Sequence, residues 1–523
     1  MVGAYMKLKK KYWVIAIIIV ITLIRFLMSY HLPIFYLKNM GYDDMLMIHQ
    51  SSYLLSGNYL GSYNSLTIVK GIFYPLILTI IRFLKLNYGV TLTLFYIFSC
   101  GIFTLSLKNI IKNKKILLLI YAVLLFNPIS YSSDIYQRIY RSSLSITEII
   151  LFLSIIIRII DNDKKIINYI LLGIISSIMF LTREDSIYII IALIILLIYN
   201  IYRKKNIKTI IINFMPIIIL FCSLNIVSII NYQKYGVYSY NELQKSNFKD
   251  TYIKIMSIKD ENDDNRFPIS KNTLIKLSDL SENFNLSHEE IENYYQNLLK
   301  ENHNKGLYYW YFRRLINIKE QFKNGDESEK YFKDLGREID NLFKEGKLKK
   351  RIVIPSVLIN TPTIDELKMI PKYTFDAIIC LETYQNVRTF DLESLKTLDN
   401  IKYNNELNSY EIKYLDYLHS DEMINKNIYE IIRIIYMCFT IVFTIIAIII
   451  FIKNIKKKDK LNIIIILISI IYIIILGGVT YSHATAFYAI RYMFLANNYI
   501  LQSLFICLNL SRLIRREKCI NYQ

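Results

Sequence analysis

Two adjacent carboxylates are the residues best suited to acid–base chemistry outside the polar middle of the chain. Asp43 and Asp44 follow Gly41 and Tyr42, shortly after a first apolar run, and open an amphipathic stretch. A carboxylate held at a membrane surface can act as a general base or a metal ligand, because a low-dielectric boundary moves its pKa. Two acids at a helix start also stabilise the positive end of the helix dipole. The residues alone leave both interpretations open.

Basic residues are expected on the same side of the membrane as the acidic pair. They are Lys70, Arg138, Arg141, Arg183 and Arg491, the last followed by Tyr492. Lys70 could be an interfacial anchor, although Gly71 beside it would allow a ligand to approach closely. Asp134, one helical turn before Arg138, could neutralise that arginine locally. Taken together, the set exceeds what anchoring needs and predicts a site for an anionic headgroup, because guanidinium binds phosphate bidentately.

The elements that must position these residues are apolar helices. Of the 523 residues, 54% are hydrophobic, and Gly (15) and Pro (8) are scarce. Runs of roughly 20 apolar residues suffice to cross a bilayer. Candidate spans are 12–29, 71–86, 90–107, 116–130, 143–160, 166–181, 186–202, 209–230, 428–452, 461–479 and 493–510. The sequence therefore predicts a polytopic α-helical membrane protein with about 10–11 transmembrane helices.

The charge distribution predicts how the chain is oriented. Residues 231–427 hold 29 of the 63 Lys and Arg and 32 of the 43 Asp and Glu, which leaves 34 basic and 11 acidic residues elsewhere. The basic excess lies in short clusters beside apolar runs, which is the positive-inside pattern and not a nucleic-acid-binding stripe. We therefore expect a multi-pass plasma-membrane protein with both termini in the cytoplasm, in contact with membrane lipid and not with nucleic acid.

Three parts follow from this pattern. Residues 1–230 are expected to form an N-terminal transmembrane catalytic module with an external acidic loop at 30–70. Residues 231–427 are expected to form an inserted, mainly α-helical extracytoplasmic domain, and 428–523 the last transmembrane helices and a basic tail. The acidic loop is predicted outside and the Lys108–Lys115 cluster inside, so the chain must cross the membrane an odd number of times between them. Two short candidate spans nevertheless lie in this stretch.

Local signals within the middle part favour structural roles. Ser287 with Glu290 and Thr363 with Glu366 have the spacing of capping boxes, which predicts that helices begin there. Trp310 is expected in an interfacial belt or a domain core in preference to a sugar-binding surface.

The order and sidedness of these motifs resemble the GT-C superfamily of polyprenyl-phosphate-sugar-dependent glycosyltransferases, and most closely its protein O-mannosyltransferase and lipid A aminoarabinose transferase branch. In that branch an external acidic motif, matched here by Asp43 and Asp44, holds the catalytic carboxylate. A Lys before a Pro-containing helix, matched by Lys70, contacts the lipid phosphate. Thr182-Arg183 and Arg491-Tyr492 resemble later phosphate-contacting motifs.

The match is incomplete at one place. The second external acid of the family, after the Asn127-Pro128 region, has no counterpart, and Arg138 and Arg141 occupy the expected place. A metal that this acid would help to hold is therefore in doubt: no cofactor is certain, and a divalent metal is left open.

The resemblance implies an inverting membrane glycosyltransferase that moves a sugar from a polyprenyl-phosphate carrier to an extracytoplasmic acceptor. The acceptor would be a cell-wall glycopolymer, a glycolipid or a protein. Asp43 would be the general base, with Asp44 as the other candidate. The alternatives are a polysaccharide polymerase or ligase and a lipid-linked glycan transporter. Of these, the transporter would place its functional charges near the bilayer midplane.

Overall fold

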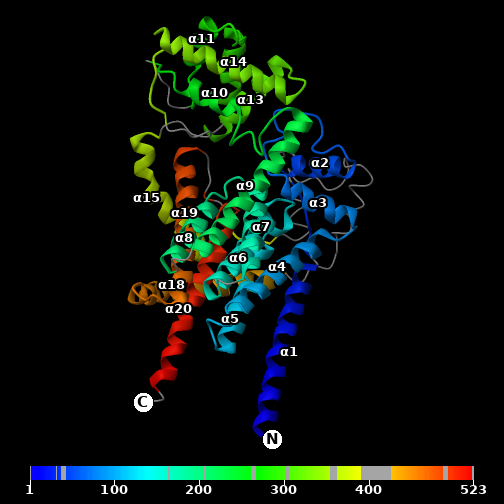
Figure 1. Ribbon diagram of the computed structural model, residues 1–523, viewed down its shortest axis with the longest axis vertical. Helices are drawn as coiled ribbons and strands as arrows, with labels where there is room; N and C mark the ends of the chain where they lie inside the picture. The colour runs from blue at the N-terminus through cyan, green and yellow to red at the C-terminus, as the bar shows by residue number, and fades with distance from the viewer. Residues whose placement is uncertain are drawn as a thin grey trace.

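The chain folds into a tall helical body with a smaller helical unit at one end (Figure 1). The computed structural model describes residues 2–30, 32–36, 43–162, 165–203, 207–260, 267–300, 305–353, 362–389, 426–486, 490 and 493–520. Within these ranges the regular secondary structure is helical, apart from two isolated β-bridges. Both termini lie at the end of the body that is remote from the smaller unit (Figure 1).

Eleven helices build the body, and each of them except α15 coincides with a predicted span. They are α1 (Val2–Tyr30), α4 (Tyr88–Ser106), α5 (Lys114–Leu125), α6 (Ser142–Asp161), α7 (Ile166–Thr182), α8 (Tyr188–Arg203), α9 (Ile207–Tyr235), α15 (Ile364–Thr383), α18 (Lys426–Asn454), α19 (Lys460–Thr485) and α20 (Ala496–Ile520). The remaining span corresponds to the short helix α3 (Phe73–Phe83), which packs on α2 (Asp44–Leu55) beside the body.

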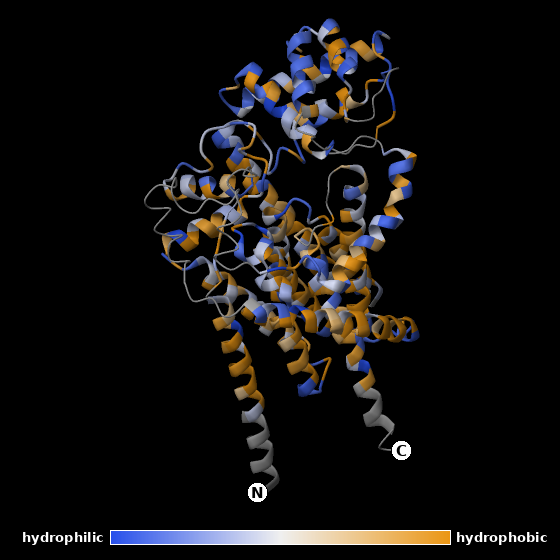
Figure 2. Cartoon of the chain, turned by 180° about the vertical axis from the view of Figure 1, so that it is seen from behind, coloured by the Kyte–Doolittle hydropathy of each residue, from blue (hydrophilic) through white to orange (hydrophobic). Residues whose placement is uncertain are grey.

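Six of the described helices are long and apolar enough to cross a membrane, which establishes the predicted class of α-helical membrane protein. They are α1, α4, α6, α9, α18 and α19. Their outer faces expose large apolar side chains such as Ile19, Phe221 and Ile445, which suits contact with lipid. Figure 2 shows the same contrast, with hydrophobic residues prevailing in the body and hydrophilic ones more frequent in the smaller unit.

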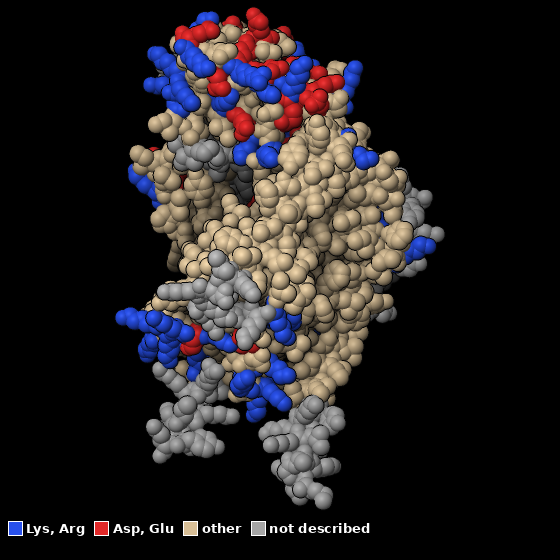
Figure 3. Space-filling view, in the orientation of Figure 1, with Lys and Arg blue, Asp and Glu red and all other residues tan. Residues whose placement is uncertain are grey.

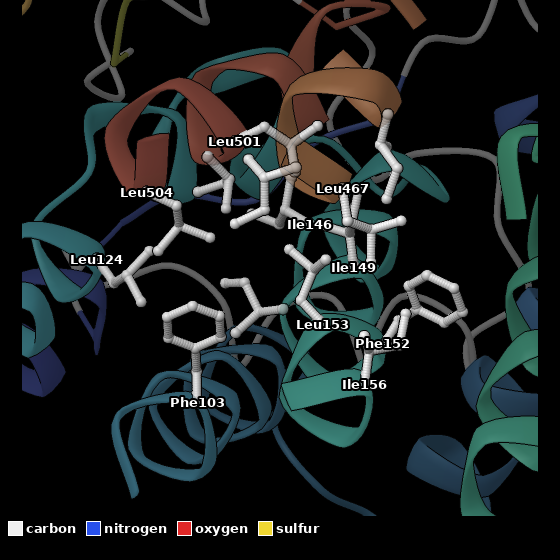
Figure 4. Close-up of a cluster of buried hydrophobic side chains, with 14 of the residues drawn as sticks. Phe103, Leu124, Ile146, Ile149, Phe152, Leu153, Ile156, Leu467, Leu501 and Leu504 are labelled. Atoms are coloured by element: carbon white, nitrogen blue, oxygen red, sulfur yellow. The ribbon is translucent and has the colours of Figure 1, made fainter. Parts of the chain in front are cut away.

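The core of the body is built around α6. Figure 4 shows Ile149 of α6 among Phe103 of α4, Leu124 of α5, Leu467 of α19 and Leu501 of α20. Each of these side chains is almost completely buried. Of the span that α6 forms, 89% is buried inside the protein. Because α6 is held on all sides, the residues at its ends have fixed positions.

Helix length accounts for the surplus span candidate between residues 66 and 107. The 11 residues of α3 rise only about 16 Å at 1.5 Å per residue, roughly half of the 30 Å hydrocarbon core. The 19 residues of α4 reach about 28 Å, and α4 meets the criteria for a membrane span. An odd number of crossings in this stretch follows if α4 crosses and α3 does not.

A second core lies in the smaller unit. It joins α10 (Asn247–Met256), α11 (Lys271–Leu280), α12 (His288–Lys300), α13 (Lys305–Glu320) and α14 (Gly325–Lys344). Phe248, Tyr252, Tyr309 and Phe312 are among its buried aromatic residues. We call residues 241–348 the helical unit, and Val69, which precedes α3, also packs into its core.

The predicted boundaries of the inserted domain differ from the boundaries that the packing of the helices shows. Residues 362–389, expected within the 231–427 domain, return to the body: Ala377, Cys380 and Leu381 of α15 belong to the core around α6. The reason is the apolar composition of α15, which offers a buried face to α18 and α19. Residues 390–425 lie outside the described residues.

Local signals correctly placed two helix starts. Thr363 and Glu366 form a reciprocal capping box at the start of α15, and Ser287 and Glu290 exchange the same two hydrogen bonds before α12. Such caps satisfy backbone N–H groups that have no partner within the helix.

Candidate functional site

Asp43 and Lys70 form the centre of the site. The Lys70 Nζ lies 3.0 Å from Oδ1 of Asp43, and the hydroxyl of Tyr140 donates to Oδ2 of Asp43 over 2.9 Å. Asp43 stands immediately before α2, but its side chain makes no capping hydrogen bond to that helix. The side chain turns to Lys70 and Tyr140 instead, while Asp44 lies in the first turn of α2, where a carboxylate stabilises the positive end of the helix dipole.

Asp44 has a different partner and is completely buried. Its two carboxylate oxygens accept hydrogen bonds of 2.7 and 2.6 Å from Nε and Nη2 of Arg138. This bidentate pair, and not the expected one with Asp134, neutralises most of the Arg138 charge. Backbone hydrogen bonds from Phe35 to Gln137 and from Ile139 to Phe35 fix the Arg138 segment beside the end of α1. With both oxygens held and no exposure, Asp44 is a poor candidate for proton transfer.

Arg141 and Glu184 form the third pair. Arg141 immediately precedes α6, where the positive end of the helix dipole disfavours a cation. The carboxylate of Glu184 offsets this cost by accepting hydrogen bonds from both terminal nitrogens of Arg141, one of them at 2.9 Å. Glu184 also lies 3.6 Å from Nζ of Lys70. Glu184 was not among the predicted site residues, and it links Arg141 to the Asp43–Lys70 pair.

Arg183 lies beside this group at the end of α7, where the helix dipole favours a cation. Its Nε donates to Asp185 over 2.9 Å, and Nη1 donates to Ser142 over 3.1 Å. Asp185, two positions further along the chain, thus neutralises Arg183. The hydroxyl of Thr182 donates to the buried Glu148 over 2.6 Å, so this residue of the predicted motif faces the body.

Gly71 explains how these segments come together. A Cβ atom on Gly71 would lie 1.9 Å from the carbonyl oxygen of Leu181, so only glycine permits this contact. Gly71 therefore lets the backbone at the end of α7 approach closely, whereas the sequence had suggested that it would let a ligand approach. It brings Lys70 to Glu184, just after the end of α7, and it rules out an interfacial anchor role for Lys70, whose side chain is only 10% exposed.

We call the eight ionised residues of these pairs the charge network. They are Asp43, Asp44, Lys70, Arg138, Arg141, Arg183, Glu184 and Asp185. Its four acids balance its four bases. The network thus gathers every predicted site residue except Arg491 and Tyr492, which lie outside the described residues.

Ion pairing keeps the central groups charged. Burial would raise the pKa of Asp43, but the positive charges of Lys70 and Arg141 outweigh it and hold that pKa well below its usual range. Burial likewise opposes the charge of Lys70, and Asp43 overcomes it, so the pKa of Lys70 is raised. For Glu184 burial is again opposed by Arg141 and Lys70, and its pKa is lowered. At neutral pH all three side chains are ionised.

A cavity of about 490 Å³ opens beside Asp43 and Lys70, and we call it the Asp43 cavity. Its walls come from the acidic loop, from the segment before α3 and from α13 of the helical unit. Trp310 is part of this wall, and Nζ of Lys70 lies 5.2 Å from the centre of its ring. Trp310 packs against the core of the helical unit, as expected, and it also forms part of the cavity wall, because the fold brings α13 to the acidic pair across more than 260 residues of sequence.

A second, smaller cavity of about 260 Å³ adjoins the other side of the network. Arg183, Asp185 and Asn497 line it together with apolar residues of α19 such as Ile475 and Val479. Within the described residues, no group of three or more His, Cys, Asp or Glu side chains is arranged to hold a metal ion.

Comparison with protein-family models, with curated proteins and with solved structures gave no match to this chain. The charge network and its two cavities therefore carry the functional argument alone.

Proposed function

We propose that the chain is an integral-membrane glycosyltransferase of the GT-C type, which moves a sugar from a polyprenyl-phosphate donor to an acceptor outside the cytoplasm. One observation carries the proposal: Asp43, an ionised carboxylate, faces an open cavity and contacts Lys70. Lys70 also lies near Glu184, which in turn pairs with Arg141. A base and two phosphate-binding cations thus meet at one point.

In this reaction a hydroxyl of the acceptor attacks the anomeric carbon of the donor sugar. Asp43 takes the hydroxyl proton while the new C–O bond forms. The bond from the anomeric carbon to the phosphate oxygen breaks, and the leaving polyprenyl phosphate keeps its electron pair. Lys70 and Arg141 stabilise the charge that develops on this phosphate. A single in-line displacement inverts the anomeric centre.

The resting pairs explain how the base becomes active. While Lys70 contacts Asp43, the carboxylate is a weak base because its pKa is lowered. A bound phosphate competes with Asp43 and Glu184 for Lys70 and Arg141, since a phosphate also accepts charge-assisted hydrogen bonds. Once Lys70 turns to the phosphate, Asp43 loses its cation and its affinity for a proton rises. Donor binding thereby prepares the base for the acceptor.

The charged surface supports the orientation that this reaction requires. Figure 3 shows Lys and Arg gathered near the end of the body that carries the termini, mixed charges over the helical unit, and few charged side chains on the broad surface between them. By the positive-inside rule the termini are cytoplasmic, and the helical unit is extracytoplasmic at the plasma membrane. The charge network lies at the helix ends nearer this unit, where α6 begins and α7 ends.

Binding of undecaprenyl phosphate to the full-length protein in lipid nanodiscs, followed by native mass spectrometry, tests the proposal. Lys70→Met and Arg141→Met should each weaken binding about tenfold or more, because each removes a charge-assisted contact to phosphate. Arg337→Met is the matched control, since Arg337 is 67% exposed on α14. Unchanged affinity in both site variants would reject the assignment.

A further inference from the structure

One helix of the helical unit has two different faces. Tyr308, Tyr309 and Phe312 of α13 point into the aromatic core and are almost completely buried. The residues that line the Asp43 cavity from the same helix are Leu307, Trp310, Tyr311 and Arg314. Their spacing of three, four and seven residues places them on one side of the helix. The core fixes α13, and its other face becomes a wall of the cavity.

The opposite wall is held in register by hydrogen bonds to the helical unit. The side chain of Asn241 donates to the carbonyl oxygen of Val69 over 3.0 Å, and the backbone N–H of Glu242 donates to Ile68 over 2.9 Å. These bonds fix the residue before Lys70 against the unit that carries Trp310. Both walls are therefore fixed relative to one another.

The composition of these walls suits a carbohydrate. Aromatic side chains offer flat apolar surfaces for the C–H faces of a sugar ring, and here Trp310 and Tyr311 provide them. Asn64, Arg314 and Asp43 add planar polar groups that can bind hydroxyls. At about 490 Å³ the cavity is within the range of small-molecule sites, roughly 300–1,000 Å³, and larger than a phosphate alone would need.

We infer that the Asp43 cavity is the acceptor subsite and that it binds a glycan, with one sugar ring packed on Trp310 and one of its hydroxyls at Asp43. The inference rests on the proposed glycosyltransferase and narrows its acceptor class from glycopolymer, glycolipid or protein to a carbohydrate chain. The helical unit is then part of the substrate site, and not a separate binding module.

The chain itself offers a direct reporter, because it contains two tryptophans, Trp13 and Trp310. In the full-length Trp13→Phe protein, emission comes from Trp310 alone. The probe is the pool of oligosaccharides released by mild acid from the envelope of cells that make the protein, after lipid extraction. We expect a saturable change in Trp310 emission that survives protease treatment of the pool and disappears after periodate oxidation.

Two variants separate a ring-binding role from a structural one. With the same pool, fluorescently end-labelled, Trp310→Ala should weaken binding about tenfold or more, while Trp310→Tyr should restore most of it because a flat ring returns. Ile318→Ala on the same helix is the control, since Ile318 is 61% exposed and does not line the cavity.

Each remaining outcome decides between the two proposals. No emission change with the glycan pool, or a change that protease abolishes, overturns the carbohydrate inference. If undecaprenyl phosphate still binds in that case, the proposed transferase stands with another acceptor. If undecaprenyl phosphate fails to bind as well, the proposed function falls together with the inference.

Discussion

Two sets of ion pairs differ in how their partners are held: a closed pair of Arg313 with Glu242, and a shared set in which Lys70 serves both Asp43 and Glu184. In the closed pair, Arg313 contacts Oε2 of Glu242 at 2.6 Å, and both side chains are at most 3% exposed. The other oxygen of Glu242 accepts a hydrogen bond from Tyr63 over 2.9 Å. In the shared set, Lys70 serves two carboxylates, and the side chain of Asp43 is 28% exposed at the cavity.

The difference lies in whether the partners can change. Neither carboxylate oxygen of Glu242 is left for a ligand, so this pair can only hold α13 and the acidic loop together. Lys70 and Arg141, by contrast, lie near the cavity and can exchange one anion for another. We infer that the closed pair builds the site and that the shared set performs its chemistry.

The largest effect that separates the two sets is expected from Asp43→Asn. Loss of the general base should lower turnover of a polyprenyl-phosphate sugar by about 10²–10⁴-fold. Stability should change by only about 1 kcal/mol, because the new amide still accepts from Tyr140 and Lys70 keeps Glu184. Sugar transfer in nanodiscs and thermal unfolding measure the two quantities. Asp279→Asn, at an exposed pair with His288, is the control, and turnover near that of the wild type would remove Asp43 from the mechanism.

The closed pair should respond in the opposite way. Arg313→Met leaves the Glu242 carboxylate buried without its cation, which typically costs about 3–5 kcal/mol of stability. The double variant with Glu242→Gln should recover part of that loss, since it removes the unpaired charge. Denaturant unfolding in detergent measures both. If Arg313→Met were as stable as the wild type, the pair would not be the structural element described.

Glu184→Gln tests whether anions compete for the shared cations. Arg141 and Lys70 lose a carboxylate, so undecaprenyl phosphate should bind about three- to tenfold more tightly, as one charge-assisted contact becomes available. Native mass spectrometry in nanodiscs provides the measurement. Weaker binding in Glu184→Gln would contradict partner exchange and would make Glu184 a residue that merely orients Arg141.

The last contrast concerns pH and compares the network with the helical unit. Burial raises the pKa of Glu329 to about 7 from a usual value of 4.5. The folded state therefore binds more protons than the unfolded state between these values, so Glu329 costs stability as pH rises from about 4.5 to 7. The lowered pKa of Glu184 has the opposite sign: its contribution is present above its usual pKa and is lost as the solution is acidified.

Thermal unfolding of Glu329→Gln between pH 4.5 and 8 isolates this contribution. Relative to the variant, the wild type should lose thermal stability up to about pH 7 and then stay constant. Parallel curves for the two proteins would show that Glu329 is not buried enough to resist ionisation. Glu345→Gln, at the exposed residue that follows α14, serves as the control.

The sequence allowed the helices and the members of the network to be predicted for a simple physical reason. Apolar runs mark the spans, and charges at their ends stand out because a charge near lipid is costly without a partner. Lys70, Arg138 and Arg141 were found in this way. Which acid pairs with which base could not be predicted, since Asp44 meets Arg138 across 94 positions of sequence and Glu184 meets Arg141 across 43.

Two further features depended on packing that leaves no local pattern. Trp310 has core-forming neighbours on both sides, and only the direction of α13 decides which aromatic residue reaches the cavity. The return of α15 to the body was hidden because Lys372 and Asp376 interrupt its apolar residues and make the segment resemble a soluble helix.

Cryo-electron microscopy of the full-length protein with bound undecaprenyl phosphate tests the central claim most directly. The account predicts phosphate density in contact with Lys70 and Arg141, with Asp43 released from Lys70 and facing the same cavity. If the phosphate lies elsewhere while Lys70 keeps its contacts with Asp43 and Glu184, the shared ion pairs are structural and the transferase proposal is contradicted.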